Sequence, residues 1–211
     1  MAKDWLAWHA SYDEPGSALQ RRLAVVQGHV SAALAACPPG PIRVVSMCAG
    51  QGRDLLGPLA DHPRRDDVTA RLVELDGRNV ARARAAVSAA GLDGVEVVQG
   101  DASPTDAYEG AVPTDVVLAC GVFGNVSDDD VRTTIDGLSM LCAVGATVVW
   151  TRHPREPSLL PAIDGWFRAA GFELVALDVD AEGRRFGVGM HRLAVEPAPF
   201  RQGIRLFTFR S

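Results

Sequence analysis

The sequence predicts a single doubly wound α/β domain, with a mainly parallel sheet of the seven-stranded type, helices on both faces and an antiparallel C-terminal portion. The length of 211 residues suits one domain. Short apolar runs alternate with segments of helical periodicity along most of the chain. The last apolar runs, from Phe172 onward, follow one another with little helix between them, which favours antiparallel pairing.

Residues 1–40 are expected to form a helical N-terminal lid. Ser17, with Gln20 three residues later, has the form of a capping box, and apolar residues recur at helical spacing as far as Leu34. The proline-rich stretch 38–41 ends this helix because proline cannot continue it.

Residues 41–152 are expected to form the ligand-binding core. Its apolar strands are predicted over residues 42–47, 70–75, 95–99, 115–120 and 147–151. The helical faces between them consist of Val80, Arg84, Val87 and Gly91, and of Val131, Ile135, Leu138 and Leu141. Ser127, with Asp130 three residues later, opens the second of these helices.

Residues 153–211 are expected to supply strands and a loop on the substrate side of the fold. A helix is predicted around Leu160, Ile163 and Phe167. The strands expected after it cover residues 172–179, 186–195 and 205–209.

Composition excludes several classes of protein. With 47% hydrophobic and 22% charged residues the chain has the balance of a globular protein. A formal net charge of -5 would repel nucleic acid, and no apolar run is long enough to span a membrane or act as a signal peptide. We therefore expect a cytoplasmic protein that binds neither nucleic acid nor membranes. The four cysteines are widely spaced, which favours free thiols and no metal site.

The strongest functional motif is Cys48-Ala49-Gly50-Gln51-Gly52, which joins the first predicted strand to a helix. Glycine at such a turn lets the backbone approach a ligand closely. A turn without any ligand is an equally good explanation of a glycine pair alone. The following strand ends weigh against that explanation, because each carries plausible ligand groups: Glu74 and Asp76, Asp101 and Ala102, and Cys120 and Gly121.

This arrangement resembles the class I S-adenosylmethionine-dependent methyltransferases between residues 42 and 151. Gly50 and Gly52 match the last two glycines of the family's first motif, whereas Cys48 replaces its first glycine and Ser46 replaces its usual acid. The resemblance implies S-adenosylmethionine as cofactor and makes residues 41–152 a cofactor-binding core. Cys48, Ala49, Gly50 and Gly52 would line the cofactor.

The resemblance also implies a role for each later strand end. Glu74 would hold both ribose hydroxyls, and Asp76 would begin the next helix. Asp101 would accept a hydrogen bond from the adenine amino group, with the Ala102 amide facing the ring. Cys120 and Gly121 would line the methionine portion. The implied reaction is methyl transfer to a small molecule by in-line displacement.

Several residues are candidates for the acceptor side. His153, just past the fifth strand, is the leading candidate for a general base, ahead of His191 and His9. Tyr12 is expected to close over the cofactor, or to pack with Trp5 and Trp8 on the sheet edge. Phe123 and Asn125 follow the fourth strand, where substrates of the family meet the methyl group, although Asn125 also suits a turn.

Two other functions remain open from the sequence. A nicotinamide-dependent oxidoreductase is disfavoured because position 55 is Leu, where a dinucleotide fingerprint needs a small residue. A non-catalytic cofactor-binding protein would account for Ser46 and Cys48, and other sulfonium chemistry is a further alternative. The residues specify neither the methyl acceptor nor the oligomeric state.

Overall fold

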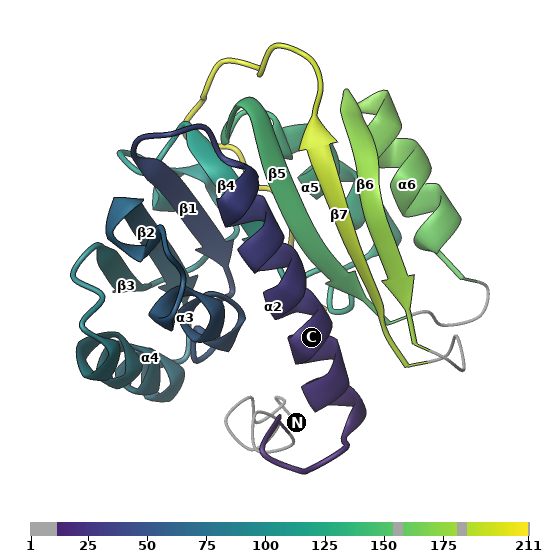
Figure 1. The fold of residues 1–211 in the computed structure, drawn as a ribbon. Coiled ribbons are helices and arrows are strands. Elements are labelled where there is room, and N and C mark those ends of the chain that lie inside the picture. Colours follow the sequence, from purple (N-terminus) through teal and green to yellow (C-terminus); the bar gives the residue numbers. More distant parts are fainter. Residues whose placement is uncertain (1–11, 154–157, 181–184, 211) are drawn as a thin grey trace.

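A computed structural model of the chain describes residues 12–153, 158–180 and 185–210 and contains a seven-stranded sheet in the order β3-β2-β1-β4-β5-β7-β6 (Figure 1). Strands β1 to β5 run parallel, and β7 runs antiparallel to both β5 and β6. The strands are Ile42–Met47 (β1), Val68–Glu74 (β2), Val95–Gln99 (β3), Thr114–Ala119 (β4), Cys142–Arg152 (β5), Phe172–Val179 (β6) and Gly187–Leu193 (β7). The predicted fold class is confirmed.

Helices cover both faces of the sheet (Figure 1). One face carries α2 (Ala18–Ala36), α3 (Arg53–Ala60) and α4 (Gly77–Ala90), and the other carries α5 (Asp128–Leu138) and α6 (Leu160–Ala169). Two short 3-10 helices, η2 (Arg65–Asp67) and η3 (Thr105–Tyr108), lie in connections. Within the described ranges, no helix has the length and apolarity needed to cross a membrane.

Serine side chains cap helices α2 and α5. The Ser17 hydroxyl accepts a hydrogen bond from the backbone N–H of Gln20, and the Ser127 hydroxyl accepts one from Asp130, each at 3.0 Å. These are the two capping positions expected from the sequence. Each cap satisfies a backbone donor that has no partner within the first helical turn.

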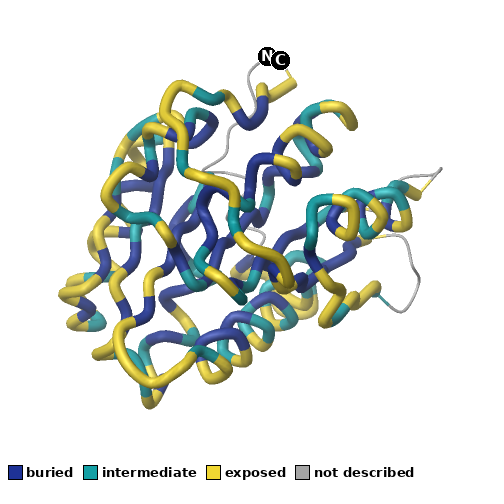
Figure 2. The backbone as a smooth tube through the Cα atoms, turned by 90° about the horizontal axis from the view of Figure 1, so that it is seen from above, coloured by how far each residue is buried: buried dark blue, intermediate teal, exposed yellow. Residues whose placement is uncertain are grey.

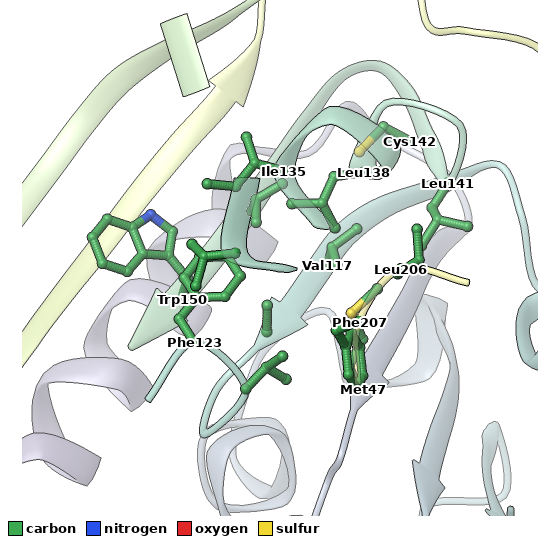
Figure 3. Packing of buried hydrophobic residues seen from close by; sticks show 14 of the residues in the cluster. Met47, Val117, Phe123, Ile135, Leu138, Leu141, Cys142, Trp150, Leu206 and Phe207 are labelled. Carbon is green, nitrogen blue, oxygen red and sulfur yellow. The ribbon is translucent and has the colours of Figure 1, made fainter. Parts of the chain in front are cut away.

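Apolar side chains fill both layers between sheet and helices. In Figure 2 the buried residues follow the inner strands, and exposed residues lie mainly on the outer turns and helix faces. The strands β1 and β4 are nearly continuous buried runs because both of their faces are covered. On the α5 side, Phe123 and Trp150 belong to the same buried cluster as Met47, Leu206 and Phe207 (Figure 3).

The prediction of a strand over residues 205–209 is wrong. Arg205 pairs only in an isolated bridge with Pro104, and Phe209 only in one with Val126. The apolar pattern of this segment has a different cause, because Leu206 and Phe207 are buried in the core on the α5 side.

The placement of Leu141 on a helical face is also wrong. Helix α5 ends at Leu138, and the Leu141 carbonyl accepts a hydrogen bond from the backbone N–H of Thr114 at 2.8 Å. This bond links Leu141 to the start of β4, so β5 begins at Cys142 instead of Thr147. The helical spacing of apolar residues extends past α5 because Leu141 and Cys142, at the start of β5, are buried as well.

The strand order creates a switch point between β1 and β4. From β1 the chain proceeds to β2 and β3 on one side, and then crosses to β4 on the other side. Open α/β sheets bind ligands outside the carboxyl ends of their strands at such a point. The glycine turn and the loops after β2, β3 and β4 all begin at this edge.

Candidate functional site

The turn from β1 into α3 is held in the left-handed region of backbone conformation. Cys48, Gly50 and Gly52 have φ angles of 52°, 57° and 74°. A Cβ atom on Gly52 would lie 2.8 Å from the Leu56 side chain and 2.9 Å from that of Leu72, so packing and backbone both require glycine there. Cys48 adopts a conformation that favours glycine, which explains why glycine suits this position in the class that the chain resembles.

The Glu74 carboxylate lies directly against this turn. Its Oε2 accepts a hydrogen bond from the backbone N–H of Gly50 at 2.8 Å, and its Oε1 accepts one from Asp76 at 2.9 Å. Glu74 is only 8% exposed. A carboxylate has about four acceptor positions, so about two remain for other donors. The backbone amides therefore fix a carboxylate that retains the capacity to accept from a ligand.

Asp76 serves α4 and not the turn. Its Oδ1 accepts a hydrogen bond from the backbone N–H of Arg78 at 2.9 Å, and its Oδ2 pairs with the Arg78 guanidinium at 2.7 Å. Hydrogen bonds from the side chain and backbone of Arg78 lower the pKa of Asp76 to about 2. The expectation that Asp76 begins the following helix is confirmed, and the two acids at the end of β2 have separate surroundings.

Asp101 lies at the end of β3 and contacts a distant part of the chain. Its Oδ1 accepts a hydrogen bond from the backbone N–H of Ser103 at 2.9 Å, and Arg205 donates to its Oδ2 at 3.3 Å. Partial burial acts to raise the pKa of Asp101, but the hydrogen bonds from Ser103 and Arg205 outweigh it and lower the pKa. Ala102 is buried, and its carbonyl accepts from the Tyr108 hydroxyl at 2.6 Å.

Two hydrogen bonds between backbone and side chains anchor the loop after β4. The backbone N–H of Gly121 donates to the Thr151 hydroxyl at 2.9 Å, and the Asn125 side chain donates to the Gly121 carbonyl at 2.6 Å. Gly121 has a φ of 81°, and no atom lies within 4 Å of the place a Cβ would take. Asn125 thus shapes the turn, while Gly121 borders open space at the switch point. Burial raises the pKa of the neighbouring Cys120 thiol well above its usual value, so the thiol is neutral.

Tyr12 lies beside the start of α3. It is buried, its hydroxyl accepts a hydrogen bond from Arg22, and the Arg53 guanidinium lies 5.6 Å from the centre of its ring. Burial raises the pKa of Tyr12 to about 12, although the charge of Arg22 acts to lower it. Tyr12 therefore lies against the first residue of α3, directly after the glycine turn. Trp5, Trp8 and His9 lie outside the described residues.

The other three acceptor-side candidates differ in access. His153 directly follows β5 and is exposed. Phe123 is fully buried against Trp150 (Figure 3), and His191 is fully buried within β7. The His191 Nδ1 accepts from the Trp150 indole N–H at 3.0 Å, and its Nε2 lies 3.2 Å from Asp164. The structure places His153 at the same edge as the glycine turn, and it holds Phe123 and His191 in the core.

Sequence reasoning missed Asp54, Arg22 and Arg205. Asp54 is in the first turn of α3, directly after the glycine motif, and this local position was a signal that could have found it. Arg22 and Arg205 reach the site from α2 and from the C-terminal segment. No local spacing could have found Arg205, because its partner Asp101 lies 104 residues away along the chain. Arg22 lies ten residues from its partner Tyr12, a spacing that no helical or strand pattern links.

Comparison with known proteins identifies a family. The family described as "Putative methyltransferase" matches residues 19–164. The uncharacterized protein YnbC of Escherichia coli is 27% identical over 121 residues, which are 56% of this chain and 20% of YnbC. The chain therefore spans about a fifth of the length of that relative.

Solved structures share the fold. An O-methyltransferase family protein from Burkholderia thailandensis aligns with a TM-score of 0.63 and 19% identity, covering 88% of this chain and 57% of that one. Fibrillarin from Aeropyrum pernix, solved with natively bound S-adenosyl-L-methionine, aligns with a TM-score of 0.56 and 15% identity, covering 72% and 66%. At these identities the likeness establishes the fold alone.

Proposed function

The chain belongs to this methyltransferase family, and from that premise we propose that it binds S-adenosylmethionine at the carboxyl ends of β1 to β4 and transfers the methyl group to a small molecule. The buried Glu74 carboxylate against the glycine turn is the observation that carries the proposal. Among the described residues the Glu74 carboxylate makes no salt bridge and accepts hydrogen bonds from two backbone amides. Two vicinal hydroxyls suit its remaining acceptor positions.

Two further features support the fit of this cofactor. Asp101 has a lowered pKa and is therefore a carboxylate at neutral pH, which suits an amino group on an adenine ring. Gly121 borders open space beside the end of β4, where a side chain would otherwise stand. The donors and acceptors of this edge thus match the adenosine portion of S-adenosylmethionine.

When bound, S-adenosylmethionine supplies a methyl group already activated by its positive sulfur. The chain then needs to hold the acceptor in line with that methyl group, and such positioning contributes about 7 to 11 kcal/mol in favourable cases. The net charge of -5 disfavours a polyanionic acceptor. The loop 120–125 also lacks the Asp/Asn-Pro-Pro-Tyr/Phe sequence of enzymes that methylate nucleobases or glutamine. A small acceptor accords with both features.

The first prediction tests Glu74. Glu74→Gln removes the charge and one acceptor pair while keeping the shape. Hydrogen bonds to a charged group contribute about 1.5 to 3 kcal/mol, so the affinity for S-adenosylhomocysteine should fall about 10- to 100-fold in titration calorimetry. Asp76→Asn is the matched control, since Asn is an equally good helix cap, and it should change the affinity less than about threefold. Equal affinity of wild type and Glu74→Gln, or saturable binding of NAD instead, would contradict the proposal.

The second prediction concerns His153, which we propose as the base for an acceptor that must lose a proton. Its place after β5 puts an exposed imidazole at the edge where methyl transfer would occur. His153→Ala should lower the rate of S-adenosylhomocysteine formation by about 100-fold or more and leave the affinity for S-adenosylhomocysteine unchanged. An unchanged rate would remove His153 from the mechanism.

A further inference from the structure

The chain after β7 crosses the molecule and returns to the carboxyl ends of the parallel strands. In Figure 1 this segment, in yellow, leaves the arrowhead of β7 and passes above β5 and β4. Its last part, residues 201–210, contacts the loop after β3 through Ser103 and the loop after β4 through Asn125. We call residues 201–210 the C-terminal strap. Neither loop is close to the strap along the chain, so only the folded structure joins them.

Hydrogen bonds fix the strap against the loop after β3. The backbone N–H of Leu206 donates to the Ser103 carbonyl at 2.8 Å, and the backbone N–H of Thr105 donates to the Ile204 carbonyl at 2.9 Å. The Thr105 hydroxyl donates to the Arg201 carbonyl at 2.7 Å. The Leu206 side chain is fully buried in the core on the α5 side. Because paired backbone groups and buried side chains resist local opening, the strap has a fixed position beside this loop.

Arg205 is the strap residue whose side chain reaches the end of β3. Its Nη1 donates to Oδ2 of Asp101 at 3.3 Å and also to the Ser103 hydroxyl. The other carboxylate oxygen, Oδ1 of Asp101, accepts from the backbone N–H of Ser103 at 2.9 Å. Each oxygen of the carboxylate therefore has its own donor. The two donor residues stand 102 residues apart along the chain.

The contact between Arg205 and Asp101 does little to hold the fold together. Their side chains are 58% and 50% exposed, and ion pairs of such exposure contribute little to stability. Its effect is on the carboxylate itself, because donors on both oxygens restrict rotation of the Asp101 side chain. A carboxylate has about four acceptor positions, so about two remain for a ligand. An acceptor that is already oriented loses less freedom on binding than one that rotates.

We propose that Arg205 is a positioning residue for recognition of the base: it orients the Asp101 carboxylate so that the remaining acceptor positions face the amino group of adenine. This inference rests on the proposed function and adds the C-terminal strap to the parts of the chain that select the base. A carboxylate accepts hydrogen bonds and donates none, so it favours an amino group and opposes the oxygen that hypoxanthine carries at the same position. Loss of Arg205 should therefore reduce the discrimination between the two bases.

The test compares S-adenosylhomocysteine with S-inosylhomocysteine, in which hypoxanthine replaces adenine. Titration calorimetry on the full chain measures both affinities in wild type, Arg205→Gln and Arg205→Lys. Wild type should prefer the adenine compound by at least about tenfold. Arg205→Gln should bind that compound about three- to tenfold more weakly, and it should bind the inosine compound within about twofold of wild type, which also demonstrates that the variant is folded. Arg205→Lys keeps a charged donor and should retain part of the preference.

Arg201→Gln is the matched control. Arg201 is an exposed arginine of the same strap, and its carbonyl is the group that accepts from Thr105, so the variant removes the same charge and leaves the contact with Asp101 intact. Both affinities should stay within about twofold of wild type.

Three results overturn the inference and leave the proposed function standing. The first is that Arg205→Gln weakens both compounds equally or weakens neither. The second is that Arg201→Gln loses as much of the preference as Arg205→Gln does. The third is that wild type binds the two compounds equally well. Wild type that binds neither compound overturns the proposed function and the inference together.

Discussion

Single residues decide the shape of the glycine turn. Gly52 combines a φ of 74° with a Cβ position that would contact Leu56 and Leu72 at under 3 Å. Gly121 has a similar φ of 81° but faces open space. An alanine at Gly121 would therefore add only backbone strain, whereas an alanine at Gly52 would add both backbone strain and a steric clash. Cys48 shows that strain alone is tolerated in this fold, since it has a φ of 52° with a side chain.

The third prediction follows from this comparison. Gly52→Ala should lower the free energy of unfolding by about 2 to 4 kcal/mol, because left-handed strain costs about 1 kcal/mol or more and overpacking costs about 1 to 3 kcal/mol. Gly121→Ala should cost only about 1 kcal/mol. Urea unfolding followed by circular dichroism measures both. Equal losses in the two variants would show that the packing around Gly52 yields without cost.

At the scale of elements, a buried polar network joins β5, β7 and α6. His191 on β7 accepts from the indole of Trp150 on β5, faces Asp164 on α6, and stacks on Phe167 at 4.1 Å between ring centres. Burial lowers the pKa of His191, although Asp164 acts to raise it. The network fixes how α6 sits on the antiparallel part of the sheet, because each polar atom in it has a specific partner.

The fourth prediction concerns the pH dependence of stability. The unfolded chain takes up a proton at His191 below about pH 6.5, whereas the folded chain resists it. The contribution of neutral His191 to the free energy of unfolding should therefore be complete above about pH 6.5. This contribution should decrease as the pH falls below that value. His191→Leu should remove this part of the dependence, and it should cost about 1 to 3 kcal/mol at pH 7.5 because the Trp150 N–H loses its partner.

The comparison variant for His191 is His29→Gln, which keeps the buried network and should keep the decline in stability. His29 lies on α2 and pairs with Asp178, away from Trp150. Urea titrations at pH 7.5 and pH 5.5 report both variants. A decline in His191→Leu as large as that of wild type would mean that another group causes it.

At the scale of the whole molecule, the proposed cofactor site depends on segments from most of the chain. The glycine turn follows β1, Glu74 ends β2, Asp101 follows β3, and Gly121 follows β4. The C-terminal segment contributes as well, because Arg205 reaches Asp101 and the backbone N–H of Leu206 bonds to the Ser103 carbonyl at 2.8 Å. A ligand at this edge contacts loops that only the folded sheet brings together, so binding should stabilise the entire domain.

The fifth prediction is a thermal shift. S-adenosylhomocysteine at 100 times its dissociation constant should stabilise the fold by about 2.7 kcal/mol, which for a domain of this size raises the melting temperature by about 5 to 10 °C. Differential scanning calorimetry measures the shift, and Glu74→Gln at the same ligand concentration should show a smaller one. A melting temperature that does not respond to the ligand would count against binding at the switch point.

The sequence by itself determined the presence of the five parallel strands, although not the start of β5, and also the caps of α2 and α5, an antiparallel C-terminal portion and the glycine turn. Each of these depends on residues that are near neighbours along the chain. Apolar spacing and capping residues report local backbone structure directly. The resemblance to the methyltransferase class implied that Asp76 begins the following helix, and Asp76 is the residue that caps α4.

Only the tertiary structure decided which distant residues meet. In the folded structure Phe123 and His191 are buried in the core. Residues 205–209 form an irregular segment with two isolated bridges and not a strand. The tertiary structure also brought Arg22 to Tyr12 and Arg205 to Asp101. The physical reason is that periodicity specifies which face of an element is buried, whereas the order of strands in the sheet specifies what lies against that face.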